Sequence, residues 1–272
     1  MAIKFSEEQI KDIVEMYSNP SISQKQIGDK YGVSRTVIKR ILKEENVYDD
    51  KRTAKKYYGD FDCFHVIDSP EKAYWLGFIS ADGCVVPPRK NGGGACVKIR
   101  LHPKDRSHLE AFIHFLNSNL EIKDRVNSGF SEGQPCIDLE INSLEMVNDL
   151  INLGVVPAKS SILKPPKINK EFVFDYIRGY FDGDGSISKM KNQNGFTFSF
   201  VGTKEILSWI QDQIGCNQKL EIRNENSINC FYFRVGGNRK PYELLSKLYN
   251  GNICLKRKEV LFQELQSSIK ET

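Results

Sequence analysis

The sequence predicts an α+β fold in which one αββαββα unit occurs twice with pseudo-twofold symmetry, after a small all-α N-terminal domain. An internal repeat predicts the duplication: AYWLGFISADGCV (Ala73–Val85) returns as DYIRGYFDGDGSI (Asp175–Ile187), with glycine over glycine 102 residues later. The segments after both copies repeat the same succession of strand and helix patterns. The first 46 residues have only helical periodicity, which predicts a separate domain. A chain of 272 residues accommodates both parts.

The N-terminal domain, residues 1–47, is expected to contain three helices. Ser6 is placed to cap the first helix, and Pro20 ends it, because the residue before a proline is disfavoured in helical geometry. Ser23 and Gln26 resemble a capping box for a short second helix. Ser34 is placed to cap the third.

This order of helices matches a helix-turn-helix motif. Gly28 falls where two helices nearly touch, and Gly32 falls where the turn needs a positive φ. In this motif the third helix enters the major groove of DNA with its outward residues. Those residues are Arg35, Thr36, Lys39, Arg40 and Lys43. The alternative is a three-helix bundle that contacts another protein.

Residues 48–68 form the predicted basic linker. Its first part, YDDKRTAKKYY, has no apolar period. It fits either a segment lying along DNA phosphates or a solvated tether.

The two repeats are predicted to span residues 69–168 and 169–272. Each motif is followed by a strand, a hairpin turn, a second strand, a helix, two more strands and another helix. In the first repeat, the turn, second strand, helix and later strands are Arg89–Gly94, Cys96–Leu101, Arg106–Leu116, Ile122–Val126 and Cys136–Ile141. In the second repeat they are Lys189–Gly195, Phe196–Val201, Lys204–Ile214, Lys219–Arg223 and Phe231–Val235.

Each motif helix carries small residues four positions apart. They are Gly77 and Ala81 in the first copy, and Gly179 and Gly183 in the second. Small residues at this spacing clear one stripe of a helix, so the two stripes are expected to pack backbone against backbone. The next glycines, Gly83 and Gly185, are expected to end their helices in the left-handed conformation.

If the two helices pair in this way, Asp82 and Asp184 emerge together at the same end. Two carboxylates at the negative ends of two helix dipoles repel each other, so either one is protonated or divalent cations neutralise both. Oxygen ligands favour Mg²⁺ (or Mn²⁺), with water and phosphate oxygens completing the shell. Such a site supports an in-line phosphodiester displacement. The alternative is two incidental aspartates at helix ends.

The stretches WLGFISADG and IRGYFDGDG resemble the two motifs of a single-chain LAGLIDADG homing endonuclease, over roughly residue 69 to the C-terminus. The resemblance implies double-strand DNA cleavage that leaves short 3′ overhangs, with the metal bound at the eighth motif position. That position is Asp82 in the first copy and Asp184 in the second. The sixth position is Ser80 in the first copy and Asp182 in the second.

The resemblance also implies a basic residue near the end of each repeat, close to the scissile phosphates. Lys159 is the candidate in the first repeat, and Lys256 in the second, with Lys258 as the second choice. Some members of the family carry a glutamine just after the second strand of each repeat. Pro103 and Gly202 occupy those places here.

The sheets are expected to form the DNA-binding saddle, because polar side chains alternate with apolar ones along their strands. The predicted contact residues of the strands and hairpin turns are Arg89, Lys90, Lys98, Arg100, Lys189, Lys191, Arg223, Tyr232 and Arg234. Asp138, Glu140 and Glu221 are expected to share this face, as cytosine-amino acceptors or as ordinary solvated residues.

Several other functions are weighed against the nuclease. The stretch from Asp182 to Ile187 matches a haloacid-dehalogenase nucleophile motif, but Arg178 interrupts the required apolar strand, and the first copy carries Ser80 in place of the nucleophile. It fails as a calcium loop at Ile187 and Gln193, and the splicing residues of an intein are missing. A non-cleaving DNA-binding regulator on the same fold, or an RNA maturase, remains an alternative.

Composition is consistent with a nucleic-acid partner without requiring one. The net charge is +4 and the pI is about 8.5. No apolar run approaches a membrane span, and the seven cysteines form no CxxC pair, so we expect reduced thiols and no structural zinc. We expect a monomer bound to double-stranded DNA, without membrane contact, in the cytoplasm of a bacterial or phage-infected cell.

Overall fold

The computed structural model describes residues 5–19, 22–49, 57–89, 94–127, 132–191, 194–223, 228–250 and 253–270. The chain divides into two compact units. One comprises Met1–Gly59 with Asn117–Leu120, and the other comprises Asp60–Leu116 with Glu121–Thr272. Within the described ranges, no helix is both long enough and apolar enough to cross a membrane.

The first unit contains the three predicted helices, α1 (Glu7–Ser18), α2 (Gln24–Lys30) and α3 (Arg35–Glu44). Ser6 caps α1, as predicted, and forms a capping box with Gln9, while Ser23 begins the capping box predicted for α2. Ser34 stands at the N-cap of α3 without a side-chain cap bond. A small apolar core joins the helices. Its buried residues are Ile13, Tyr17, Ile27, Ile38, Ile41 and Leu42.

The turn between α2 and α3 depends on two glycines. A Cβ on Gly28 would lie 2.5 Å from the carbonyl oxygen of Val33, so only glycine allows this close approach. Gly32 has a φ of +64°. Both predictions for this turn are confirmed. Pro20 and residues 50–56 of the predicted linker lie outside the described residues.

The second unit contains the duplicated elements in the predicted order. The first copy consists of α4 (Pro70–Asp82), β1 (Gly83–Val86), β2 (Cys96–Leu101), α5 (Arg106–Phe115), β3 (Lys123–Val126), β4 (Pro135–Ile141) and α6 (Leu144–Asn152). The second consists of α7 (Val173–Asp184), β5 (Gly185–Lys189), β6 (Phe196–Gly202), α8 (Lys204–Ile214), β7 (Glu221–Ile222), β8 (Phe231–Gly237) and α9 (Arg239–Ser246). Short 3₁₀ turns occur at Pro103–Asp105, Lys159–Ser161 and Lys170–Phe172. The α+β class and the repeated order are confirmed.

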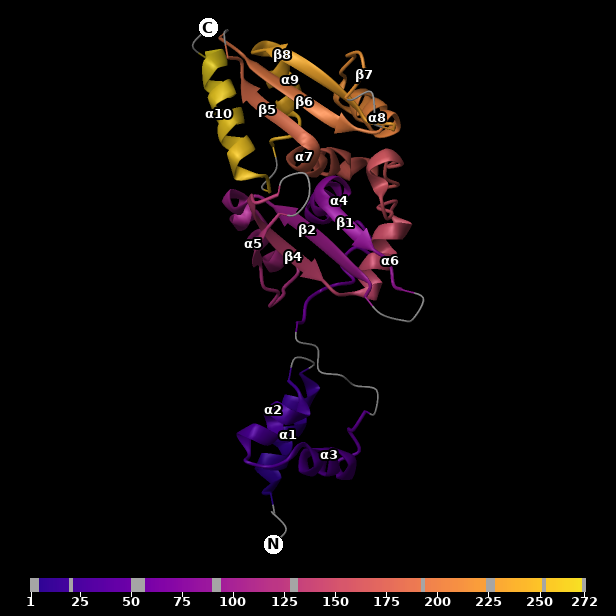
Figure 1. The fold of residues 1–272 in the computed structure, drawn as a ribbon, viewed down its shortest axis with the longest axis vertical. Helices are drawn as coiled ribbons and strands as arrows, with labels where there is room; N and C mark the ends of the chain where they lie inside the picture. Colours follow the sequence, from indigo (N-terminus) through magenta and orange to yellow (C-terminus); the bar gives the residue numbers. More distant parts are fainter. Residues whose placement is uncertain are drawn as a thin grey trace. The chain divides into compact units, whose positions relative to one another are not determined.

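Each copy builds one antiparallel sheet. In the described residues, these are two four-stranded sheets with the matching orders β1-β2-β4-β3 and β5-β6-β8-β7. Strand β6 alternates buried phenylalanines with half-buried hydroxyl residues, which gives the sheet one apolar face and one polar face. In Figure 1, α4 and α7 lie side by side in the middle of this unit, with one sheet on each side.

The predicted glycine stripes hold the two helices together. A Cβ on Gly77 would collide with the carbonyl oxygen of Tyr176, and a Cβ on Gly179 would collide with that of Tyr74. One turn later, Gly183 faces the side chain of Ala81 at similarly close range. The two backbones therefore approach as closely as the spacing predicted.

The prediction for Gly83 and Gly185 is wrong. Gly83 has φ −77° and ψ 149°, and Gly185 has φ −90° and ψ 167°, so both are extended residues that begin the next strand. They are glycines for a different reason, because a Cβ would overlap the side chain of Ile79 in the first copy and of Phe181 in the second.

One helix follows the second repeat without a helical counterpart in the first. Helix α10 (Lys256–Lys270) comes after α9, whereas the corresponding place after α6 is taken by the 3₁₀ turn Lys159–Ser161. Figure 1 shows α10 beside β5, and the two elements are in contact.

Candidate active site at the paired helix ends

Asp82 and Asp184 stand at the last positions of α4 and α7, directly before β1 and β5. The Asp82 carboxyl carbon lies against the end of α7, since a Cβ on Gly183 would be 3.4 Å from it. The structure therefore brings together the two aspartates that the repeat singled out.

The environment of Asp82 disfavours its negative charge. The residue retains solvent-exposed surface, but the surrounding protein removes part of the hydration of its carboxylate. This desolvation, followed by the charge of Asp184, raises the pKa of Asp82 to about 6, against the opposing effect of Lys258 and Lys159. This is the electrostatic cost expected for two carboxylates that share one site.

Asp184 is less exposed than Asp82. Burial raises its pKa, while the positive charges of Lys159, Lys258 and Arg223 lower it. A cavity of about 150 Å³ opens beside this carboxylate and is also lined by Lys159 and Arg223. A second cavity, of about 260 Å³, is lined by Asp82 and again by Lys159. Both carboxylates are thus accessible, and Lys159 lines both cavities.

Lys159 caps the end of the first motif helix. It lies in a 3₁₀ turn that follows the left-handed residue Ala158, and its side chain is buried. Its ammonium donates to the carbonyl oxygen of Ala81 at 3.1 Å and to that of Gly83. Burial lowers its pKa, and the nearby carboxylates oppose that effect.

In the second repeat the lysine placed like Lys159 is Lys258, the second choice, rather than Lys256. Lys258 is only 2% exposed, and it donates to the carbonyl oxygens of Phe181, Asp182 (2.9 Å) and Gly185. Burial lowers its pKa to about 8. Lys256 is exposed and pairs with Glu259 at 2.9 Å. Two residues apart in α10, the lysines point to opposite faces because a helix turns about 100° per residue.

The two buried lysines, Lys159 and Lys258, both offset negative charge at the end of a motif helix. The last carbonyl groups of a helix lack intrahelical partners and carry partial negative charge, which two carboxylates increase here. Lys159 and Lys258 donate to these carbonyls and offset that charge. The three acceptors of Lys258 use all the N–H donors of an ammonium, whereas the structure gives Lys159 two acceptors.

Asp182 contributes a role that the sequence did not reveal. It is fully buried and accepts hydrogen bonds from Tyr74 Oη (2.7 Å), Tyr249 Oη (2.8 Å) and the backbone N–H of Leu255 (2.7 Å). These donors and the charge of Lys258 oppose the rise in its pKa that burial causes. Asp182 thereby ties α4 to the segment that leads into α10 and Lys258. The only sign of this role in the sequence is that the sixth motif position is Asp182 in the second copy but Ser80 in the first. The Ser80 hydroxyl donates to Leu76 O at 2.8 Å.

The polar face of the first sheet carries paired charges. Arg100 lies opposite Asp138, and Lys98 opposite Glu140, so the predicted acidic residues do share this face. The Arg100–Asp138 pair is joined by two hydrogen bonds, whereas Lys98 and Glu140 approach to only 3.7 Å.

The second sheet presents a different polar face. Tyr232 donates to Glu221 at 2.5 Å, and Arg234 lies 5.8 Å from the ring of Tyr232. Lys189 pairs with Glu264 of α10 at 3.1 Å. Arg89, Lys191 and Arg223 are exposed, and Lys90 lies outside the described residues.

Pro103 and Gly202, at the positions where some family members carry a glutamine, have different local structures. Pro103 begins a 3₁₀ turn, and Gly202 ends β6. A Cβ on Gly202 would lie 2.5 Å from the hydroxyl oxygen of Tyr180, so this hydroxyl occupies the space that a larger residue would need.

The candidate DNA-binding residues of α3 form a shallow basic surface. All of them except Arg35 line, together with Glu44, an open hollow of about 420 Å³. Its lining residues are Thr36, Lys39, Arg40, Lys43 and Glu44. Lys39 and Lys43 lie 5.0 and 5.3 Å from the ring of Tyr48, and Arg40 lies 3.6 Å from Glu44. Arg35 is exposed at the start of the helix and donates to Gln24 at 3.0 Å.

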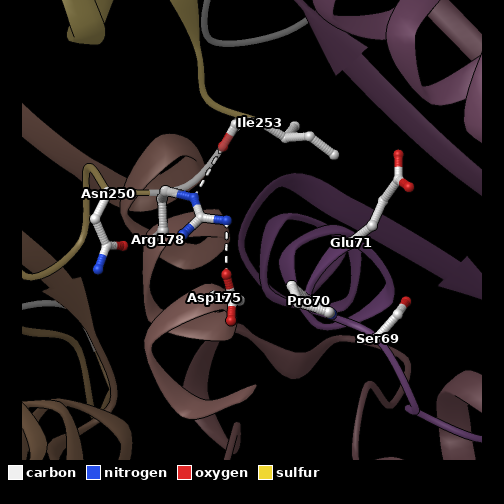
Figure 2. Close-up of a pocket in the computed structure, with 7 residues that line it drawn as sticks. All are labelled: Ser69, Pro70, Glu71, Asp175, Arg178, Asn250 and Ile253. Carbon is white, nitrogen blue, oxygen red and sulfur yellow. Dashed lines mark hydrogen bonds and ion pairs between the residues drawn. The ribbon is translucent and has the colours of Figure 1, made fainter. Parts of the chain in front are cut away.

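A larger cavity, of about 600 Å³, lies at the other end of the helix pair (Figure 2). Its lining residues are Ser69, Pro70, Glu71, Asp175, Arg178, Asn250 and Ile253, none of which is a predicted site residue. Arg178 donates to Ile253 O (2.8 Å), Leu248 O (3.2 Å) and Asp175 (2.8 Å), and Figure 2 shows two of these contacts. The guanidinium thus holds the chain segment before α10, and this cavity is unrelated to the paired carboxylates.

Comparison with known proteins gives structural matches only. No protein-family model matches the sequence, and no curated protein matches it. Similar solved structures include the LAGLIDADG meganuclease I-AabMI bound to uncleaved DNA, which is 15% identical with a TM-score of 0.47, covering 75% of this chain and 92% of that one. The I-LtrWI LAGLIDADG homing endonuclease bound to target DNA is 14% identical with a TM-score of 0.44, over 73% and 92% of the two chains.

A further similar structure, the LAGLIDADG homing endonuclease I-GzeII in complex with a DNA target, is 12% identical with a TM-score of 0.46, over 74% and 89% of the two chains. All three TM-scores lie below 0.5.

Proposed function

We propose that this protein is a LAGLIDADG-type endonuclease, active as a monomer, that hydrolyses one phosphodiester bond on each strand of duplex DNA. The observation that carries the proposal is the meeting of Asp82 and Asp184 at the ends of two tightly paired helices, with a buried lysine at each end. Their raised pKa values indicate a site built at an electrostatic cost, which is typical of functional positions.

The donor set fits a hard divalent cation such as Mg²⁺ or Mn²⁺. Among the described residues there is no cluster of three or more His, Cys, Asp or Glu side chains suited to a metal ion, so Asp82 and Asp184 would be the protein's ligands. Mg²⁺ is commonly held by one or two carboxylates, with water and substrate phosphates completing the shell. When bound, it supplies Lewis-acid stabilisation of the charge on the reacting phosphate.

The protein's own residues would orient and balance this chemistry. The carboxylates would hold the cation, and the packing of α4 against α7 holds the carboxylates in place. Lys159, beside both cavities, has an N–H donor that its two carbonyl acceptors do not use, so it can donate to a phosphate oxygen. Lys258 acts through its positive charge, because its donors are taken.

Two DNA-binding surfaces would position the duplex. The two sheets lie on either side of the helix pair (Figure 1), so one chain would offer contacts to both half-sites without dimerisation. The exposed basic residues of α3 would enter a major groove in the manner of a helix-turn-helix motif. A DNA footprint of the bound protein would show whether α3 contacts the duplex at the cleaved site or at a separate site.

One observation favours a second candidate, a DNA-binding regulator that does not cut. The space of one expected glutamine is filled by the Tyr180 hydroxyl at Gly202. A protein with a reduced active site would still bind DNA through α3 and the sheets.

The deciding experiment is incubation of the full chain with a randomised duplex library, first with Ca²⁺ and then with Mg²⁺. The nuclease is expected to retain a defined sequence in Ca²⁺ and to cut it in Mg²⁺. The Asp184→Asn variant should retain the same sequence without cutting it, whereas Lys256→Ala should cut like the parent. Retention without cutting by the parent in either ion would establish the regulator instead.

A further inference from the structure

The ion pair between Arg100 and Asp138 holds an arginine in a fixed orientation on the open face of the first sheet. The two residues are cross-strand neighbours on β2 and β4. Arg100 Nε donates to one carboxylate oxygen of Asp138 at 2.6 Å, and Nη2 donates to the other at 2.8 Å. The arginine side chain is 51% exposed and the aspartate 24%. Asp138 therefore holds the guanidinium of Arg100 against the sheet, while the rest of the guanidinium is exposed to solvent.

This arrangement leaves a defined set of donors facing outward. A guanidinium has five N–H donors, and Asp138 accepts from two of them. The remaining donors, two on Nη1 and one on Nη2, form a planar fork on the side away from the carboxylate. Such a fork matches two adjacent acceptors. In the major groove of DNA, the N7 and O6 atoms of guanine provide this pattern.

A phosphate group offers the same acceptor geometry, and Lys98, Lys123 and Arg125 add positive charge near this pair. A phosphate bound to the fork would, however, lie beside the Asp138 carboxylate, which repels it. The pKa of Asp138 is lowered chiefly by its hydrogen bond with Arg100, so this carboxylate stays negative at neutral pH. A neutral base edge avoids that repulsion.

The second repeat has no arginine–aspartate pair at the matching position. The two sheets can be aligned through the glycine that follows each motif helix: Gly83 pairs with Ile99 in the first sheet, and Gly185 pairs with Phe200 in the second. The next position on the strand is Arg100 in the first sheet but Val201 in the second, opposite Tyr232. Tyr232 donates to Glu221, so this row presents no cation of its own.

We propose that Arg100, oriented by Asp138, reads one guanine in the half-site under the first repeat, and that the second half-site has no equivalent guanine contact. This inference rests on the proposed binding of duplex DNA. It predicts a target whose two halves differ at matching positions, although the protein halves have the same topology.

The test is selection of bound duplexes from the randomised library in Ca²⁺, with the full chain and three variants. The parent is expected to require guanine at one position that Arg100→Lys relaxes by roughly ten- to a hundredfold, because lysine cannot make the paired contact. Asp138→Asn should relax the same position less, since the arginine remains but is held less firmly. Lys98→Gln, on the neighbouring but looser ion pair, is the matched control and should weaken all sequences to a similar degree.

The outcomes separate this inference from the proposed function. If the parent selects a site and Arg100→Lys weakens every sequence equally, Arg100 contacts phosphate and the inference is wrong. If Arg100→Lys changes neither affinity nor preference, the pair is only a solvated cross-strand contact, and the inference is again wrong. If the parent retains no sequence at all, the proposed function fails together with it.

Discussion

The two repeats build the same helix end from different parts of the chain. In the first, Asp82 is accompanied by Lys159 from a 3₁₀ turn after α6. In the second, Asp184 is accompanied by Lys258 from the first turn of the additional helix α10. What the two halves share is the placement of an ammonium against helix-end carbonyls beside a carboxylate. Both helix ends require a positive charge beside their carbonyls, but the lysine that provides it comes from a 3₁₀ turn in the first half and from a helix in the second.

The halves differ most in how firmly that ammonium is held. Lys258 has three carbonyl acceptors, and the buried carboxylate of Asp182 fixes the segment before it. Lys159 has two acceptors and borders both cavities, and Ser80 replaces the carboxylate. We conclude that the second half is the more rigid support and the first half the more accessible one.

The largest expected effect tests whether both halves contribute one carboxylate to a shared site. Either Asp82→Asn or Asp184→Asn should reduce Mg²⁺-dependent cleavage on the order of a hundred- to a thousandfold, because each removes a cation ligand. Cleavage rates on the selected site measure this, with binding in Ca²⁺ as the control. Full cleavage by one of the two variants would show that the halves act independently.

The next effect distinguishes Lys258 from Lys256 in the first turn of α10. Lys258→Met should lower the free energy of unfolding by about 3 kcal/mol, because three carbonyl groups, two of them in buried hydrogen bonds, lose their donor. Lys159→Met should cost less, since two carbonyls are affected. Lys256→Met, the matched control on the exposed face, should leave stability unchanged. Urea unfolding of the three variants gives the ranking, and equal losses for Lys256 and Lys258 would refute the assignment.

The pairing of the two motif helices predicts symmetrical sensitivity to a single methyl group. Gly77→Ala and Gly179→Ala should each destabilise the protein by about 2–3 kcal/mol, because each new Cβ collides with a carbonyl oxygen of the other helix. Thermal unfolding measures both. A marked difference between them would mean that the helices do not pack as equivalent partners.

The smallest expected effect concerns the acid sensitivity caused by a buried histidine of the first half. His108 is buried, and its ring nitrogen lies 3.2 Å from Tyr74 Oη. Burial, and then the charges of Lys258 and Arg257, lower its pKa to about 3. Below the unfolded-state pKa of about 6.5, the unfolded chain binds a proton that the folded protein does not. Stability should therefore fall as pH falls from 7 towards 3, with about 2 kcal/mol from this residue by pH 5.

The His108→Gln variant isolates this contribution. Its loss of stability between pH 7 and pH 5, followed by urea unfolding, should be smaller than that of the parent. Identical losses would show that His108 is not kept neutral by its surroundings.

The sequence predicted those features that depend on local pattern. Repetition and the four-residue spacing of Gly77 with Ala81 were sufficient to pair the motif helices and to select the two aspartates. The order of strands and helices followed in the same way from periodicity.

The features that it did not predict depend on tertiary contacts. The choice between Lys256 and Lys258 required the rotation of α10 about its axis, which a short sequence stretch does not define. The role of Asp182 arises from two tyrosines far away in the chain. Gly83 and Gly185 were assigned to the wrong conformation because neighbouring side chains, rather than their backbone angles, demand glycine there.

The most direct measurement is a crystal structure of the full chain bound to its selected duplex in Mn²⁺, with an anomalous difference map. The account predicts a metal peak within coordination distance of both Asp82 and Asp184, beside a phosphate of the DNA. A peak that contacts neither aspartate, or a complex in which the two carboxylates face away from the DNA, would contradict it.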